Sequence, residues 1–235
     1  MFGRYGFGID IYYIVLVLPA FLIALIAQMK VQTTFNRLRT KDIQSGYDGY
    51  YAARNILDTN GLYDVAIELS NGRLSDHYDP KRRVISLSND VYSGRSAVAL
   101  GVAAHEVGHA LQYQTEYFPI KIRSAMIPVT NIGSTLSMPL ILIGYLMNLI
   151  GFIYLGIALF SLVTIFQLLT LPVEYDASRR AMVSLSNLKI LNATELIDAK
   201  KVLSAAALTY VASLLVSFMS LLRMLFIVSS GRKKR

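Results

Sequence analysis

The chain has 235 residues, of which 54% are hydrophobic, and its mean hydropathy is +0.46. This composition is too apolar for an ordinary soluble domain, so we expect a membrane protein. The formal net charge of +8 indicates basic loops that face anionic lipid. Because no basic, aromatic-laced surface is evident, we expect a lipid bilayer and no nucleic acid as partner. The chain lacks cysteine, which excludes disulfides and thiolate zinc ligands.

Four apolar segments have a length that suits a membrane span. They cover residues 11–29, 126–146, 149–171 and 202–228. We interpret the first as a retained anchor rather than a cleaved signal peptide, because the run is long and no clear cleavage site follows. The second and third lie in a stretch without charge, 124–173, and predict a tight helical hairpin that breaks near Asn148. Arg223 interrupts the fourth segment, which we expect to span, with a position along the membrane surface as the alternative.

The most polar part of the chain, residues 30–96, predicts a small α+β region. The expected elements are a helix over 46–57, a half-buried strand over 62–69, a hairpin turn at Asn71-Gly72, a loop over 76–80 and a strand over 83–88. Asn60-Gly61 is a typical signal for the end of a helix. Strands followed by a helix with two histidines have the local order of a zincin fold.

Residues 105–109 read His-Glu-Val-Gly-His inside an apolar stretch, 96–114, that we expect to be a buried helix. On a helix, His105 and His109 lie one turn apart on one face. Both can then bind one Zn²⁺ while Glu106 acts on a zinc-bound water. The alternative is a pair of structural histidines, but two of the three histidines of the chain lie here, and an unpartnered buried imidazole is costly. The pattern therefore predicts one Zn²⁺ per chain.

A catalytic zinc normally has three protein ligands, so one ligand remains to be found. His77 is the other histidine and lies in a turn-rich loop, where it is a ligand, a substrate contact or merely exposed. The acidic residues that follow the motif are Glu116, Glu174, Asp176, Glu195 and Asp198. Glu116 is expected at the exit of the motif helix. The last two belong to a segment, 192–198, that reads as a capped helix start and explains them structurally.

Glu174 differs from the other acids because it ends a long uncharged segment. A carboxylate so close to the hydrocarbon edge is costly unless it is paired or functional. The two predicted crossings between His109 and Glu174 also return both residues to the same side of the membrane. We therefore predict Glu174 as the third metal ligand, with an ordinary acid paired to Arg179 or Arg180 as the alternative.

Residues 105–109, together with 174–181 (Glu-Tyr-Asp-Ala-Ser-Arg-Arg-Ala) beyond a two-span hairpin, resemble the bacterial membrane-bound neutral zinc metallopeptidases (the YugP-like family). The resemblance extends over most of the chain. The sequence is more distantly similar to the HtpX-like membrane proteases, which share the gluzincin pattern of two histidines and a downstream glutamate. In that wider group an aspartate four residues after the glutamate commonly orients a ligand histidine. Here Ser178 holds that position, so Asp176 or Ser178 serves as the supporting residue.

The residues and the resemblance together predict a zinc-dependent endopeptidase of gluzincin type at the membrane surface, acting on peptides or membrane proteins. Glu106 is the expected general base. We expect the strand Val84–Ser88 to bind substrate backbone at the cleft edge, and an oxyanion-stabilising side chain among His77, Tyr175 and Arg179.

Two other functions remain as alternatives. An intramembrane protease would carry its motif on a spanning helix and take a ligand from a later Asp-Gly, whereas the Asp-Gly of this chain, Asp48-Gly49, precedes the motif. A zinc-binding membrane adaptor or chaperone without turnover is disfavoured because Glu106 is present.

The expected fold is an α-helical multi-pass membrane protein of about four spans with a small α+β, zincin-like catalytic region. The expected domains are an N-terminal extension and first anchor (1–29), the zincin-like region (30–123), a transmembrane hairpin (124–172), the third-ligand segment and helix (173–201), and a fourth apolar segment with a basic tail (202–235).

Charge asymmetry predicts the orientation in the membrane. The basic residues on the flanks of the catalytic side are Lys30, Arg37, Arg39, Lys41, Lys121, Arg123, Arg179, Arg180, Lys200 and Lys201. The other side has Arg4 and the basic tail 232–235. This balance predicts a plasma-membrane protein with a cytoplasmic catalytic region, although four full spans place the basic tail outside.

Overall fold

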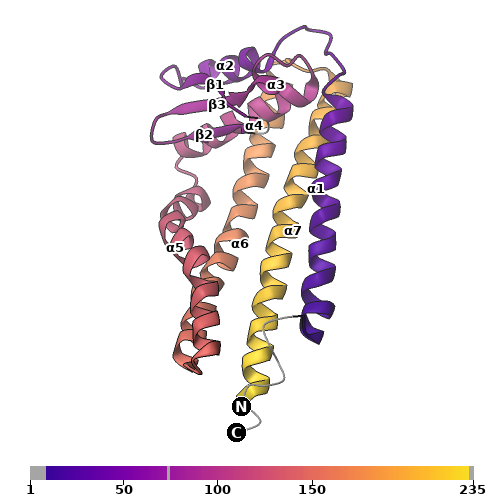
Figure 1. Cartoon of the computed structure of the whole chain (residues 1–235). Coiled ribbons are helices and arrows are strands. Elements are labelled where there is room, and N and C mark those ends of the chain that lie inside the picture. Colours follow the sequence, from indigo (N-terminus) through magenta and orange to yellow (C-terminus); the bar gives the residue numbers. More distant parts are fainter. Residues whose placement is uncertain (1–8, 73–74, 233–235) are drawn as a thin grey trace. The chain divides into compact units, whose positions relative to one another are not determined.

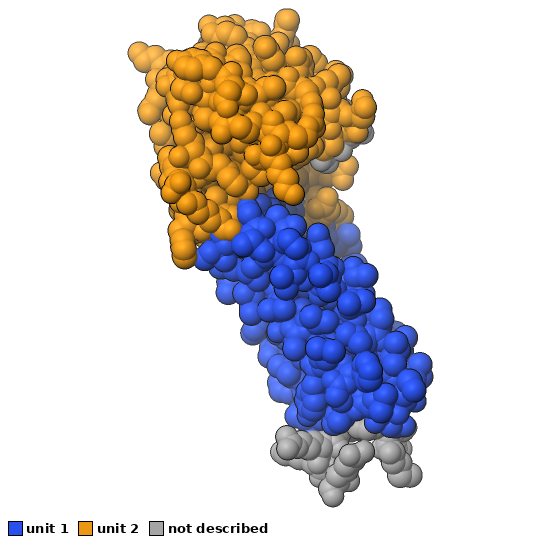
Figure 2. Space-filling model, turned by 90° about the vertical axis from the view of Figure 1, so that its left-hand side faces the viewer, with its two compact units in different colours: residues 1–27, 122–171, 209–235 blue, residues 28–121, 172–208 orange. Residues whose placement is uncertain are grey.

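A computed structural model describes residues 9–72 and 75–232 (Figure 1). The chain divides into two compact units, coloured separately in Figure 2: unit 1 covers 1–27, 122–171 and 209–235, and unit 2 covers 28–121 and 172–208. The elements are η1 (Tyr13–Val17, a π-helical turn), α1 (Leu18–Leu38), α2 (Gly49–Thr59), β1 (Ala66–Ser70), β2 (His77–Asp79), β3 (Val84–Ser88), α3 (Asn89–Tyr92), α4 (Ala97–Gln114), α5 (Phe118–Leu146), α6 (Ile150–Asn187) and α7 (Ala193–Arg232).

Four of the described helices are long and apolar enough to cross a membrane. They are Tyr13–Leu38, Phe118–Leu146, Ile150–Asn187 and Ala193–Ser230. Each covers all or nearly all of one of the four segments that hydropathy predicted, and the fourth segment is helical throughout. The three-stranded sheet and the shorter helices belong to unit 2. The expected fold class, a helical multi-pass membrane protein with a small α+β region, is therefore confirmed.

Unit 1 contains a break between two helices and a buried ion pair. The predicted break between α5 and α6 is present, and Asn148 has a φ of 56° there. Arg223 of α7 forms a 2.6 Å ion pair with Asp10 and lies over the ring of Tyr13 at 5.3 Å. Both side chains of the ion pair are about nine-tenths buried. A partner of opposite charge is what an arginine inside an apolar helix requires.

The sheet of unit 2 has the order β1-β3-β2, with β3 parallel to β1 and antiparallel to β2. All five residues of β3 are buried. Because both edges of β3 are already paired, the predicted addition of substrate backbone at this strand is wrong. β2 is an edge strand, and its side away from β3 is an edge of the sheet.

Two predictions about the strands are corrected. The predicted loop at 76–80 contains β2, in which Tyr78 pairs with Ile85 of β3. The predicted hairpin at Asn71-Gly72 does not join two adjacent strands, since β1 and β2 lie on opposite sides of β3. The hairpin instead joins β2 and β3, and its turn contains Arg83 with a φ of 55°. Leu69, the last residue of the predicted half-buried strand 62–69, is 53% exposed.

The core of unit 2 packs α2, the sheet and α4 against parts of α6 and α7. α2 begins after Asp48, whose side chain accepts a 2.8 Å hydrogen bond from Tyr51 N, as expected for an N-cap. The helix ends at the predicted Asn60-Gly61, where Gly61 has a φ of 74°. The largest buried side chains of this core include Leu57, Ile85, Leu100 and Leu185.

Candidate metal centre

The two motif histidines lie on α4, a helix with a well-defined N-terminal cap. Ser96 is the N-cap, and its hydroxyl accepts a 3.2 Å hydrogen bond from Ala99 N. Alanine, valine and leucine bury most of the helix, so α4 is anchored in the core of unit 2. The rings of His105 and His109 lie 4.8 Å apart, edge to face. Their side chains are 15% and 13% exposed.

Helix α6 supplies the third residue through a seam of close packing. Val173, Ala177, Ala181 and Leu185 recur at four-residue spacing and are at most 1% exposed, so they form one buried stripe of the helix. Opposite them, a Cβ at Gly108 of α4 would lie only 2.5 Å from Ala177 O. Glycine at this position is therefore what permits the close approach of α4 and α6.

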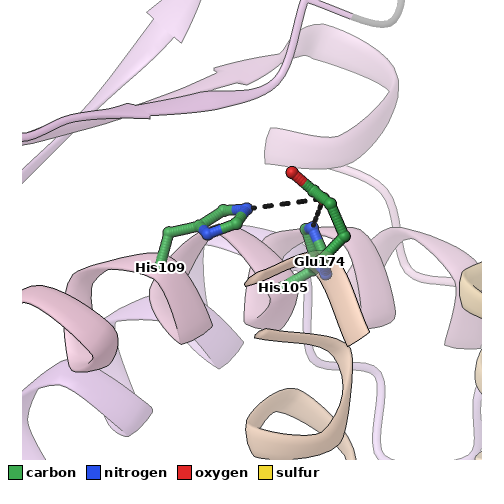
Figure 3. A group of neighbouring side chains, drawn as sticks. All are labelled: His105, His109 and Glu174. Carbon is green, nitrogen blue, oxygen red and sulfur yellow. Dashed lines mark hydrogen bonds and ion pairs between the residues drawn. The ribbon is translucent and has the colours of Figure 1, made fainter. Parts of the chain in front are cut away.

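This approach brings Glu174 to both histidines, as Figure 3 shows. Its Oε2 lies 3.3 Å from His105 Nε2 and 3.7 Å from His109 Nε2. The Glu174 side chain is 5% exposed. One possible ligand atom from each of the three residues lies within 4.8 Å of the others.

These three residues fit a zinc ion by the chemistry of their donors. Two imidazole nitrogens and one carboxylate oxygen form a typical catalytic zinc set that leaves one position open. Within residues 9–72 and 75–232, these three residues form a group of histidine and acidic side chains whose ligand atoms lie close enough together to hold one metal ion. His77 is not part of the group: it is exposed on β2, and its Nδ1 lies 2.8 Å from Ser75 O.

Each histidine is held at its other ring nitrogen. His105 Nδ1 lies 3.1 Å from Ser178 Oγ, and His109 Nδ1 lies 3.0 Å from Gln112 Oε1. The Gln112 amide is itself oriented, because its Nε2 donates to Val173 O at 2.7 Å and to Asp176 Oδ2 at 3.1 Å. An oriented amide oxygen accepts a hydrogen bond from the Nδ1–H of His109, so the lone pair on Nε2 faces Glu174.

Asp176 and Ser178 thus support different histidines. Ser178 contacts His105 directly, whereas Asp176 reaches His109 through Gln112. Arg180 Nε donates to Asp176 Oδ2 at 2.6 Å, and Arg179 also pairs with this carboxylate. The sequence left Asp176 and Ser178 as alternatives, and Gln112 is the residue that sequence reasoning missed. Its position three residues after His109, on the same face of α4, is the signal that points to it.

The side chain of Glu106 lies in a buried environment. The residue is 8% exposed. Burial raises its pKa, the two motif histidines lower it, and the negative charges of Glu174 and Asp76 raise it further, with a net increase. Asp76, next to β2, was not predicted as part of this region. Its carboxylate accepts a 2.7 Å hydrogen bond from Ser88 N.

The other acids considered in the sequence have structural partners. Glu116 lies at the exit of α4 with a φ of 52° and pairs with Lys121 at 2.9 Å. Glu195 forms a capping box, because its Oε2 accepts from Asn192 N and the Asn192 side chain accepts from Glu195 N. Asp198 pairs with two lysines.

Comparison with known proteins agrees with this chemistry. Residues 13–229 match the family described as "Putative neutral zinc metallopeptidase". A protein of Bacillus subtilis (strain 168) named "Putative membrane protease YugP" is 47% identical over 220 residues, which cover 94% of this chain and 98% of that protein. No solved structure matches the chain. By the extent of both matches, the chain belongs to the family described as "Putative neutral zinc metallopeptidase".

Proposed function

We propose that the protein is a zinc-dependent endopeptidase of gluzincin type that cleaves peptides or membrane proteins at the membrane surface. One Zn²⁺ per chain would be held by His105, His109 and Glu174. The observation that carries the proposal is the convergence of these three donors, two half-buried histidines of α4 and the buried Glu174 of α6, beside the buried Glu106. The zincin-like character of unit 2 belongs to the same proposal.

Zinc in such a site acts as a Lewis acid that lowers the pKa of water and polarises a carbonyl group. Glu106 would then take a proton from the attacking water at its carboxylate and deliver it to the leaving amine. Its raised pKa suits both halves of this transfer, because a general acid–base group works best when its pKa is near the working pH. Ser178 and Gln112 would keep the two imidazoles oriented during the reaction.

The outer edge of β2 is the position we propose for substrate backbone. β2 lies at a sheet edge, and its Tyr78 packs on Tyr113 of α4 with the ring centroids 5.8 Å apart. The strand therefore adjoins the helix that carries both histidines. An extended peptide paired with this edge would gain main-chain hydrogen bonds, which provide affinity with little dependence on sequence.

The fold disfavours the intramembrane alternative. α4 is not among the four candidate spans, so the His-Glu-x-x-His helix belongs to unit 2 rather than to a spanning segment. We further propose that the catalytic region is cytoplasmic, from the basic flanks. A cysteine introduced at Asp79 should then react with an impermeant reagent only after permeabilisation of the cells. Labelling in intact cells would contradict this orientation.

Glu106→Gln is the variant that tests the enzymatic proposal. It keeps the size of the side chain and removes the proton acceptor, so zinc content should stay near wild type while hydrolysis falls by about 10²–10⁴-fold. Purified protein is incubated with casein, the products are identified by peptide fingerprinting, and zinc is measured in the same samples. Glu116→Gln, an exposed acid near the same helix, is the control. Wild-type cleavage by zinc-loaded Glu106→Gln would favour a zinc-binding adaptor, with the cleavage due to a contaminant.

A further inference from the structure

A cavity of unit 2 lies between α1 and α7, and its lining contains none of the residues of the metal centre. Its volume is about 410 Å³, within the usual range of about 300–1,000 Å³ for small-molecule sites. α1 contributes Lys30, Thr34 and Arg37, which recur at helical spacing and so share one face. α7 contributes a stripe from Ile197 to Leu208. Figure 1 shows α1 and α7 side by side.

The lining is strongly basic and contains no acidic side chain. Lys30, Arg37, Lys200 and Lys201 all line it. Lys201 pairs with Asp198 at 2.9 Å. Within the described part of the chain, the other three form no ion pair, and they are exposed. Like charges gathered around one cavity repel each other, so an anion bound there would be stabilised by several cations at once.

The cavity lies where a spanning helix leaves the apolar part of its sequence. Lys30 directly follows the apolar run 11–29, and Lys200 and Lys201 directly precede the apolar run 202–228. These basic residues therefore fall at the level of lipid head groups. On α7 the lining continues into the apolar run through Ala205 and Leu208, and Leu208 is 40% exposed. One cavity thus combines cations, the hydroxyls of Thr34 and Ser204, and an apolar end.

We propose that this cavity binds the head group of an anionic phospholipid. The phosphodiester would contact Lys30, Arg37 and Lys200, and the start of an acyl chain would lie along Ala205 and Leu208. A soluble phosphate would use the cations but would leave the apolar end of the cavity uncovered. The site would fix a lipid against α1 and α7 and is independent of the zinc chemistry proposed above.

A tryptophan reporter provides the test, because the chain has no native tryptophan. Leu208→Trp in the full-length protein is reconstituted into phosphatidylcholine nanodiscs that contain a small fraction of lipid with brominated acyl chains. Brominated phosphatidylglycerol should quench the fluorescence more than brominated phosphatidylcholine at equal mole fraction. Leu155→Trp, on α6 in unit 1 and also about half exposed, should be quenched equally by both. Equal quenching at Leu208→Trp would overturn the proposal.

Charge variants separate a site from general surface attraction. A basic residue near an anionic surface contributes about fivefold in binding, so Lys30→Gln with Lys200→Gln should lower the preference for phosphatidylglycerol at least about fivefold. Lys81→Gln with Lys189→Gln removes the same charge elsewhere and should change the preference less than about twofold. An equal loss in both pairs would overturn the proposal, because it would indicate a non-specific field.

Two further experiments test whether free phosphate binds in place of lipid and whether the tryptophan reporter itself affects binding. Inorganic phosphate, compared with chloride at equal ionic strength, should leave the preference intact. Loss of the preference would show a site for free phosphate and would overturn the lipid proposal. Native mass spectrometry of the unlabelled wild type from mixed lipid should show retained phosphatidylglycerol, which Lys30→Gln with Lys200→Gln loses. Absence of retained lipid in the wild type would contradict the proposal without recourse to any variant.

Discussion

Gly108→Ala would place a methyl group where α4 and α6 touch beside the proposed metal centre. The new Cβ would lie 2.5 Å from Ala177 O, whereas real Cβ contacts are essentially never shorter than 3.0 Å. The neighbouring atoms are backbone, so a side-chain rotation cannot relieve the clash. The two helices must therefore separate locally by at least about 0.5 Å, or the site must distort by a similar amount.

Two energies of opposite sign decide the effect on stability. Alanine is favoured over glycine inside a helix by about 1 kcal/mol, whereas overpacking costs about 1–3 kcal/mol. The close backbone contact puts Gly108→Ala at the costly end, so we expect a net loss of about 1–2 kcal/mol. For a chain of this size, that lowers the unfolding midpoint by about 2–8 °C.

The effect on metal binding should exceed the effect on stability. Zinc–ligand distances tolerate about ±0.2 Å, so a shift of about 0.5 Å between His109 and Glu174 disturbs the donor set. We expect zinc affinity to fall by about 10–100-fold, as it does when support of the ligands is removed. Competition with a fluorescent chelator measures the affinity, and a thermal scan of metal-free protein measures the stability.

Gly101→Ala is the matched control on the same helix. Its Cβ would lie 3.2 Å from the Ala199 Cβ, a contact that yields by a few tenths of an ångström. Helix propensity should then balance or exceed the strain, and zinc affinity should stay at the wild-type value. If Gly108→Ala bound zinc as tightly as Gly101→Ala, the close approach of α4 and α6 would not be what positions Glu174.

Two predictions concern the ligands and their support. Glu174→Gln should lose most of the zinc that the wild type retains after dialysis, while His77→Ala should keep it; full zinc content in the first variant would refute Glu174 as a ligand. Gln112→Ala should weaken zinc affinity by about 10–100-fold because it frees His109 at Nδ1, and Ser178→Ala should act in the same direction. Gln114→Ala, at the end of the same helix, should have wild-type affinity in the chelator assay.

Local sequence signals were sufficient for most of the helical fold. The apolar stretch 96–114, the Asn60-Gly61 end of α2 and the uncharged stretch before Glu174 are local signals, so their consequences can be read without the tertiary structure. The length of α6 was harder to predict. The polar residues after Glu174 suggested a separate segment. Apolar residues among them recur every four positions and are buried, and α6 continues through Asn187 without a break.

The sheet and the support of the ligands depend on contacts that are distant in sequence. Asn71-Gly72 is a strong local turn signal, but it cannot reveal that β1 pairs with β3 in parallel across the intervening β2. Likewise, Asp76 lies near Glu106 because the pairing of β2 with β3 brings it to Ser88, whose backbone N–H donates a hydrogen bond to its carboxylate. Hydropathy and motif spacing contain no information about such pairings. The influence of Asp76 on Glu106 could therefore not be predicted from the sequence.

The proximity of Asp76 to Glu106 predicts a shift in the pH dependence of hydrolysis. Glu106 must be ionised to accept a proton, so activity rises as the pH passes through its pKa. The negative charge of Asp76 contributes to the raised pKa of Glu106. Asp76→Asn removes this charge and keeps an oxygen that can accept from Ser88 N. The pKa of Glu106 should fall, and the acid limb of kcat/KM should move to lower pH.

Asp79→Asn is the control for this prediction, because Asp79 lies at the end of β2, three residues after Asp76, and its pKa is lowered by backbone hydrogen bonds from the following turn. Its acid limb should coincide with that of the wild type. Zinc content is measured at each pH, because protonation of ligand histidines also removes activity in acid by releasing metal. If zinc stayed bound and the limb of Asp76→Asn did not move, or moved to higher pH, Glu106 would not be the ionising base that Asp76 influences.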